Sequence, residues 1–216
     1  MLSKIFPKIH AEGYKFLVIA GIITIIFYTF SDLLGLIGLV LTVWVYYFFR
    51  DPDRIPIDND DYLISPADGE IIKVEEVDGP KELNLENKKF KKISIFMNVF
   101  DCHVNRTPCS GKIEEILYKP GKFFNASLDK ASEDNERNYY KITNKNGEDV
   151  IVVQIAGLIA RRIVCETLEN DDLNQGDRIG MIRFGSRADL YFENYKPLVK
   201  LEQRAVAGET LIARKV

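Results

Sequence analysis

The chain has 216 residues, a formal net charge of -3 and a sequence pI near 5.6. Its length fits one globular domain with an appendage, and its charge balance supplies no basic face, which argues against a nucleic-acid partner. The three cysteines, with no C-x-x-C pair, argue against a disulfide framework or a thiolate zinc site and are expected to be reduced, on the cytoplasmic side: Cys102, Cys109 and Cys165.

Residues 16–49 are almost entirely apolar, and Ser31 and Asp32 form the main polar break between two halves. Each half is slightly shorter than the roughly 20 residues that span a bilayer, so the pattern predicts a tight transmembrane hairpin or two helices in one leaflet. A cleaved signal peptide would need a small-residue cleavage site after the first half, and none is found. Because lysines precede and arginines follow the segment, we expect residues 1–50 to anchor the chain at the cytoplasmic face of the cell membrane.

Residues 51–216 consist of short β-rich runs separated by turn signals. Asn146-Gly147, between "YYKIT" and "DVIVVQI", predicts a β-hairpin. Short helices are expected only at 159–170 and 126–137. The sequence therefore predicts a mainly β (α+β) protein: a hydrophobic helical hairpin, then a compact, mostly antiparallel β-sandwich or barrel with a few short helices.

The stretch "RFGSRADLYF" raises a chemical question at Gly185-Ser186. Alternating apolar residues predict a half-buried strand, yet a flexible residue and a hydroxyl interrupt its start. The glycine leaves its own carbonyl uncrowded, so the Ser186 hydroxyl is able to attack it. A serine hydrolase elbow, G-x-S-x-G, is not matched because Phe184 occupies the first glycine position, and Arg187 and a strand follow the serine. A Gly-Ser bulge is the structural alternative.

A second group of reactive residues lies in "FMNVFDCHVNRTPCSG", where Asp101, His103, Asn105 and Arg106 are expected to converge on one pocket. His103 is the only imidazole outside the N-terminal arm, so it is the candidate general acid or base near neutral pH. The apolar residues of the same stretch are expected to be core: Phe96, Val99 and Phe100.

Six ordered segments, "FFRDPDR", "SPADGEI", "FMNVFDCHVNR", "PGKFFNASLDKASEDNER", "QIAGLIARRIV" and "RFGSRADLY", closely resemble the short, single-chain bacterial and archaeal form of phosphatidylserine decarboxylase proenzymes. The resemblance covers nearly the whole chain. It implies self-cleavage between Gly185 and Ser186 into a large chain (1–185) and a small chain (186–216), which stay together because the strands around the cut are expected to share a sheet.

The resemblance also implies the cofactor, the reaction and the partners. Ser186 becomes a pyruvoyl group, which forms a Schiff base with the serine headgroup of phosphatidylserine and accepts electrons as CO2 leaves to give phosphatidylethanolamine. Neither a metal nor pyridoxal phosphate is implied. The expected partners are the phospholipid, the membrane and the two chains of one precursor, and a homodimer stays open.

Residue roles follow from the matched motifs. Asp68, His103 and Ser186 are expected to carry out self-cleavage. Arg106 stands where longer relatives have a second histidine, so His103 is assigned to both cleavage and decarboxylation. Asp101 either orients His103 or ends the strand.

The remaining assignments concern substrate binding and one rival function. Arg161 and Arg162 are candidates for the lipid phosphate, with a structural salt bridge as the alternative for one of them, and Asn125 is expected to line the site. The triplet 129–131 also matches the hairpin of lipoyl domains. The rival is therefore a membrane-tethered carrier or interaction module modified at Lys130, without decarboxylase activity.

Overall fold

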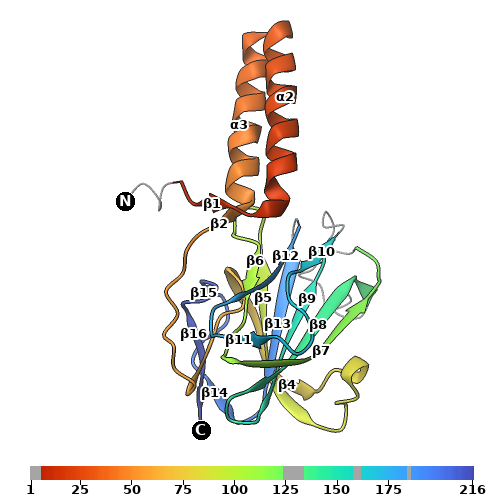
Figure 1. Cartoon of the computed structure of the whole chain (residues 1–216), viewed down its shortest axis with the longest axis vertical. Helices are drawn as coiled ribbons and strands as arrows, with labels where there is room; N and C mark the ends of the chain where they lie inside the picture. Colours follow the sequence, from red (N-terminus) through yellow and green to blue (C-terminus); the bar gives the residue numbers. More distant parts are fainter. Residues whose placement is uncertain (1–5, 124–133, 158–161, 184–185) are drawn as a thin grey trace. The chain divides into compact units, whose positions relative to one another are not determined.

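The computed structural model describes residues 6–123, 134–157, 162–183 and 186–216. The chain divides into two compact units, Met1–Asp53 and Arg54–Val216. The first unit is helical and the second is built from strands (Figure 1). The protein is therefore mainly β with an N-terminal helical hairpin, as the sequence predicts.

The helical unit contains a short 3-10 turn, η1 (Ala11–Gly13), followed by α2 (Tyr14–Phe30) and α3 (Asp32–Phe48). The break between the two long helices falls at Ser31, as predicted. The helical stretch from residue 11 to residue 30 is long and apolar enough to cross a membrane, whereas α3 is shorter. Before and after the helices, β1 (Lys8–Ile9) pairs with β2 (Arg50–Asp51), which closes the base of the hairpin.

Small residues allow α2 and α3 to pack closely against each other. A Cβ atom at Gly38 would lie 2.9 Å from the hydroxyl oxygen of Thr24, so only glycine fits there. The Thr24 hydroxyl is 2.9 Å from that of Thr42 on the facing helix. Close backbone approach and a hydroxyl pair are the contacts that associate helices when the surroundings are apolar.

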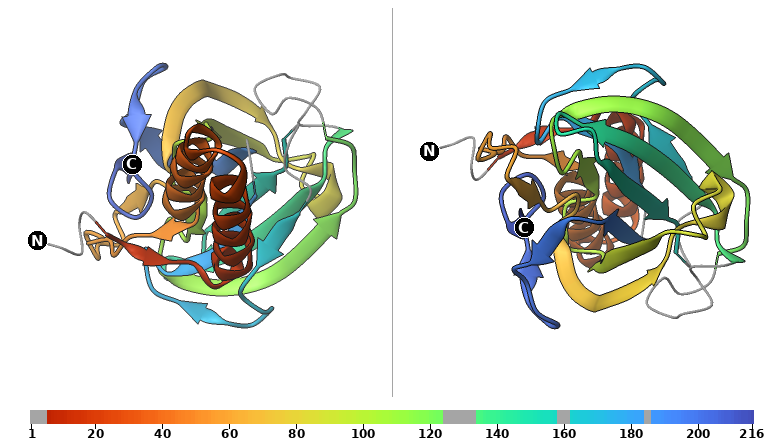
Figure 2. Two further views of the ribbon diagram at one scale, coloured as in Figure 1. Left: turned by 90° about the horizontal axis from the view of Figure 1, so that it is seen from above. Right: turned by 90° about the horizontal axis from the view of Figure 1, so that it is seen from below.

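The strand-built unit is organised around an eight-stranded antiparallel sheet with the order β11-β7-β8-β9-β13-β5-β4-β15. Figure 2 shows its long strands curling around one interior. In that order, its strands are Asp172–Leu173, Gly111–Lys119, Arg137–Asn144, Asp149–Ile155, Ser186–Phe192, Lys89–Met97, Gly69–Asp78 and Arg204–Ala205.

Two three-stranded sheets complete this unit. One has the order β10-β12-β6, with strands Ile163–Cys165, Arg178–Ile182 and Val104–Arg106. The other has the order β14-β16-β3, with strands Tyr195–Pro197, Leu211–Lys215 and Tyr62–Ile64. A short 3-10 turn, η2 (Lys81–Leu83), lies between β4 and β5.

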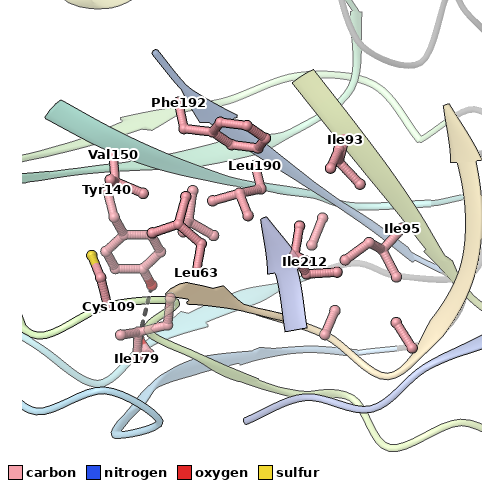
Figure 3. Packing of buried hydrophobic residues seen from close by; sticks show 14 of the residues in the cluster. Leu63, Ile93, Ile95, Cys109, Tyr140, Val150, Ile179, Leu190, Phe192 and Ile212 are labelled. Carbon is pink, nitrogen blue, oxygen red and sulfur yellow. Dashed lines mark hydrogen bonds between the residues drawn. The ribbon is translucent and has the colours of Figure 1, made fainter. Parts of the chain in front are cut away.

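The main hydrophobic core draws residues from all three sheets. Leu190 of β13 and Ile95 of β5 meet Ile179 of β12 and Ile212 of β16 in this interior (Figure 3). All four are fully buried, and each such side chain stabilises the fold by about 1.5–3 kcal/mol. A second, smaller cluster on the opposite face of the large sheet includes Leu83 of η2, so the central strands are buried on both faces.

The predicted β-hairpin at Asn146-Gly147 is confirmed. It joins β8 to β9, and Gly147 has a φ of +78°, which glycine adopts without strain. The side-chain oxygen of Asn144 accepts hydrogen bonds from the backbone N–H groups of Asn146 at 2.9 Å and Glu148 at 3.0 Å. Local sequence therefore fixes this turn.

Two expectations about the architecture are wrong. The helix expected at 159–170 is replaced by β10 at residues 163–165, because this segment pairs with β12. The strands around Gly185-Ser186 were expected to share a sheet, but β12 and β13 belong to different sheets. The helix expected at 126–137 lies mostly outside the described residues, and Arg137 at its end begins β8.

Candidate active site

Ser186 is the first residue of β13, at the centre of the large sheet. It pairs with Met97 of β5, is fully buried, and its Oγ lies 3.8 Å from the Met97 sulfur. Alternation along the strand puts its side chain on the core face, together with Ala188 and Leu190. The strand was predicted to be half-buried, but both of its faces are buried, because Arg187 and Asp189 on the alternate positions are also covered. Phe184 and Gly185 lie outside the described residues.

His103 lies just before β6, beside the end of β12. It is fully buried, and its carbonyl oxygen accepts a 3.2 Å hydrogen bond from the Ile182 N–H. Ile182 precedes Ser186 by only four residues, so the imidazole and the serine come from neighbouring segments. The Nδ1 atom of His103 lies 3.0 Å from the backbone oxygen of Asp101. A carbonyl oxygen only accepts, so Nδ1 carries the proton and the lone pair lies on Nε2.

The carboxylate of Asp101 stabilises the loop of residues 98–101. It accepts a 2.9 Å hydrogen bond from the Asn98 N–H and pairs with the Arg204 guanidinium. The hydrogen bond with Asp101 raises the pKa of Arg204. Asp101 therefore holds His103 through its backbone carbonyl, while its side chain secures the turn that precedes the histidine.

Asp68 lies at the entrance of β4. Its carboxylate accepts hydrogen bonds from the Arg54 guanidinium, at 2.8 and 3.0 Å, and from the Ala207 N–H at 2.7 Å. The next residue, Gly69, has a φ of +157°, and a Cβ atom there would lie 2.2 Å from the Phe96 carbonyl oxygen. Only glycine allows this approach, which sets Asp68 beside the end of β5.

The loop that carries Asp68 is joined directly to the strand that follows His103. The Pro66 carbonyl oxygen accepts a 2.9 Å hydrogen bond from the Arg106 N–H. The side chain of Arg106 is buried and donates to the Gly176 carbonyl oxygen at 2.8 Å. Thus Arg106 links the loop that carries Asp68 to the loop that carries Gly176.

The residues expected to bind substrate are only partly described. Arg162 is exposed, and its carbonyl oxygen accepts a 3.3 Å hydrogen bond from the Arg183 N–H, next to the strand that leads to Ser186. Asn125, Lys130 and Arg161 lie outside the described residues. A salt bridge or a phosphate contact of the two adjacent arginines therefore stays a prediction.

The expectation that Phe96, Val99 and Phe100 form core is wrong for Phe100, which is 72% exposed. Phe96 and Val99 are half-buried. Phe100 lies on the tight turn that Asn98 and Asp101 close, and such a turn directs its tip toward solvent.

Sequence reasoning missed Met97 and Gln154. Met97 contacts the Ser186 hydroxyl, and Gln154 lies within the apolar run "VIVVQIAG" of β9, where it is fully buried. A polar side chain inside a buried strand is the signal that could have identified Gln154, because such groups need hydrogen-bond partners. Within the described parts of the chain, no group of three histidine, cysteine or acidic side chains is arranged to hold a metal ion.

Comparisons with known proteins identify the family of the chain. The family model described as phosphatidylserine decarboxylase matches residues 41–213. The chain belongs to the phosphatidylserine decarboxylase family. It is 75% identical over 215 residues to a phosphatidylserine decarboxylase proenzyme of Pelagibacter ubique, with complete coverage of both chains. Proteins of the same name from Ruegeria pomeroyi and Cereibacter sphaeroides are 52% and 49% identical and cover 99% of this chain, and the matches cover 98% and 92% of their own lengths.

The matched part of the phosphatidylserine decarboxylase model begins inside α3 and ends inside β16. It therefore includes Asp68, His103 and Ser186, together with every strand of the large sheet. None of the comparisons supports the alternative of a carrier modified at Lys130.

Proposed function

We propose that the chain is a phosphatidylserine decarboxylase proenzyme that cuts its own backbone between Gly185 and Ser186. The observation that carries this proposal is the complete burial of Ser186 at the point where the chain passes from one sheet to another. An intramolecular attack needs no route from solvent to the hydroxyl. A hydrolase acting on an external substrate needs such a route, so the burial disfavours that alternative.

His103 is the proposed base for self-cleavage. With Nδ1–H held by the Asp101 carbonyl, Nε2 takes the proton from the Ser186 hydroxyl as Oγ bonds to the carbonyl carbon of residue 185. The bond between that carbon and the nitrogen of residue 186 then breaks, and the nitrogen receives the proton. The product is an ester whose elimination separates the two chains.

The small chain, 186–216, is expected to remain in place after cleavage. It supplies β13, which lies between β9 and β5 in the large sheet, and β16, which lies between β14 and β3. It also supplies β15 at the edge of the large sheet, paired with β4. The pairings of β13 with β9 and β5, of β16 with β3 and of β15 with β4 join the small chain to the large one, whereas β14 belongs to the small chain. The expected ladder between β12 and β13 is absent from the described residues.

For decarboxylation, a ketone derived from Ser186 would supply the electron sink, without a metal or pyridoxal phosphate. Position 186 suits this group because its side chain faces the apolar Met97 and lies in a fully buried part of the sheet. His103, on the neighbouring segment, is the proposed donor of the proton that replaces the carboxyl group. We propose Arg162 as a contact for the lipid phosphate because it is exposed beside this segment.

Membrane attachment is part of the same proposal. The helix that ends at Phe30 is long enough to cross a bilayer, and the apolar α3 follows it directly. A phospholipid substrate stays in the bilayer, so an anchored enzyme meets it without extracting it. We expect the hairpin to attach the protein to the cytoplasmic face of the cell membrane.

Intact mass under denaturing conditions tests the cleavage. The wild-type chain should give two fragments that meet at 185/186, and the smaller one should resist Edman sequencing because its terminus is a keto acid. Ser186→Ala should stay as one inactive chain, whereas Ser94→Ala, at a buried serine on β5, should be cut normally. Release of labelled CO2 from headgroup-labelled phosphatidylserine tests the decarboxylation. An active, uncut wild-type chain would refute the proposal.

A further inference from the structure

A chain of uncharged polar side chains crosses the buried interior next to Ser186. Its members are Tyr140 of β8, Gln154 of β9 and Asn105 of β6, and all three are fully buried. The Tyr140 hydroxyl lies 2.9 Å from Gln154 Oε1, and Gln154 Nε2 lies 2.9 Å from Asn105 Oδ1. Figure 3 shows the Tyr140 ring within the core. Its hydroxyl also lies 2.9 Å from the backbone carbonyl oxygen of Ile179 in β12.

The direction of these hydrogen bonds is fixed at one end by a backbone group. The Pro66 carbonyl oxygen, 3.3 Å from Asn105 Nδ2, only accepts, so the amide nitrogen of Asn105 must face it. The Asn105 oxygen then accepts from Gln154 Nε2, so the amide oxygen of Gln154 faces the Tyr140 hydroxyl. The single proton of that hydroxyl has two acceptors at 2.9 Å, Gln154 Oε1 and the Ile179 carbonyl oxygen. Burial raises the pKa of Tyr140, so its hydroxyl stays protonated as this order requires. The amide donor of Gln154 therefore points toward Asn105, and the amide donors of Asn105 point away from Gln154.

The last acceptor in this direction is the Met97 sulfur. It lies 3.6 Å from Asn105 Nδ2 and 3.8 Å from Ser186 Oγ, so the amide and the hydroxyl donate to one atom. A methionine side chain has three rotatable bonds and packs adaptably, so it defines no single position by itself. Gln154 and Pro66 hold the Asn105 side-chain amide from two sides. The amide is therefore able to fix the position of the thioether.

We infer that Asn105 is a positioning residue for self-cleavage, which acts by holding the Met97 thioether and thereby the orientation of the Ser186 hydroxyl. This inference rests on the proposed cleavage at 185/186. Reactions between groups held in one molecule depend steeply on alignment, and a displacement of 1 Å costs about 10²-fold in rate. A thioether is a weak acceptor, so it orients the hydroxyl without holding back its proton.

Two substitutions separate the parts of this arrangement. Asn105→Asp keeps the shape and the oxygen that accepts from Gln154, but its carboxylate has no N–H to give to sulfur. Met97→Leu keeps the volume and removes the acceptor. Both should slow cleavage of the full-length chain, Asn105→Asp by about tenfold or more. Ser94→Ala, a buried polar deletion on the opposite face of β5, is the matched control and should be cut at the wild-type rate.

The test measures the cut fraction against time after synthesis, by mass, with circular dichroism as the check on folding. In the Met97→Leu background, Asn105→Asp should cause no further slowing, because both changes break the same connection. Hydroxylamine, which cleaves esters, should release no extra fragments from folded Asn105→Asp, since the defect precedes ester formation.

Three results would overturn the inference. They are wild-type cleavage by folded Asn105→Asp, wild-type cleavage by Met97→Leu, and full additivity of the two changes. Met97→Leu alone decides the matter if Asn105→Asp does not fold. Failure of the wild-type chain to be cut would instead refute the proposed function, so the two failures are distinguishable.

Discussion

Strand β13 carries a buried ion pair directly after Ser186. The Arg187 Nε lies 2.8 Å from one carboxylate oxygen of Asp189 and the terminal nitrogen lies 3.0 Å from the other. Their side chains are 0% and 1% exposed. They point away from the core face that holds Ser186, because they occupy the alternate positions of the strand. The pair therefore braces the start of β13 from the opposite side of the sheet.

Arg187→Met should destabilise the protein strongly, since it leaves the Asp189 carboxylate buried beside an apolar side chain. Breaking a buried pair in this way costs about 3–5 kcal/mol. At about 2–4 °C per kcal/mol for a chain of this size, the unfolding midpoint should fall by about 10 °C. The double variant Arg187→Met/Asp189→Leu should recover most of this loss, because apolar replacement of both partners is often neutral. Arg187→Lys should recover only part, since a compact ammonium does not reproduce the planar guanidinium.

The assay is thermal unfolding of the full-length chain in detergent, followed by near-ultraviolet circular dichroism. Every variant carries Ser186→Ala, so all samples are uncut. Lys89→Met, which breaks the exposed Lys89–Asp78 pair, is the control and should move the midpoint by no more than about 2–4 °C. An unchanged midpoint for Arg187→Met, or a double variant as unstable as the single one, would refute the reasoning.

Three further predictions concern single residues. The exposed Cys165 should react with maleimide well before Cys109, because burial raises the pKa of the Cys109 thiol to about 12; mass mapping that finds the reverse order would contradict this. Burial alone would raise the pKa of Glu82, but the hydrogen bond from Lys119 is among the interactions that hold it below its usual value. Glu82→Gln should therefore lower the unfolding midpoint at pH 7, with the difference from the parent vanishing as pH falls through that lowered pKa; a difference independent of pH would argue against it. Gly69→Ala should destabilise by at least about 1 kcal/mol, because of its positive φ and the carbonyl oxygen 2.2 Å from the new Cβ, and an unchanged denaturation midpoint would count against this.

Features set by neighbouring residues could be predicted from the sequence. The turn at Asn146-Gly147 depends on a glycine with positive φ, and the burial of Leu190 follows from strict alternation along β13. The break at Ser31 follows from composition alone. Each of these features needs only a few consecutive residues, which is why local patterns are sufficient.

Features that depend on distant partners could not be predicted. Ile163 to Cys165 pair with β12, and this tertiary pairing overrides a local helical tendency. The exposure of Phe100 depends on a turn closed by side-chain hydrogen bonds rather than on hydrophobicity. The candidate site itself was predicted as a set of residues, but its hydrogen bonds, such as that between Gln154 and Asn105, join strands far apart in sequence.

The transfer of the chain from the sheet of β12 to the sheet of β13 has a consequence for a cut made there. The last ladder bond on one side is donated by Arg183, and the next ladder begins at Ser186. Among the described residues, no strand pairing would be lost by a cut at 185/186, so the ladders of β12 and β13 should remain after cleavage. After such a cut, Ser186 should remain paired with β5 and Arg183 should remain bonded to Arg162, so we expect the two chains to stay together.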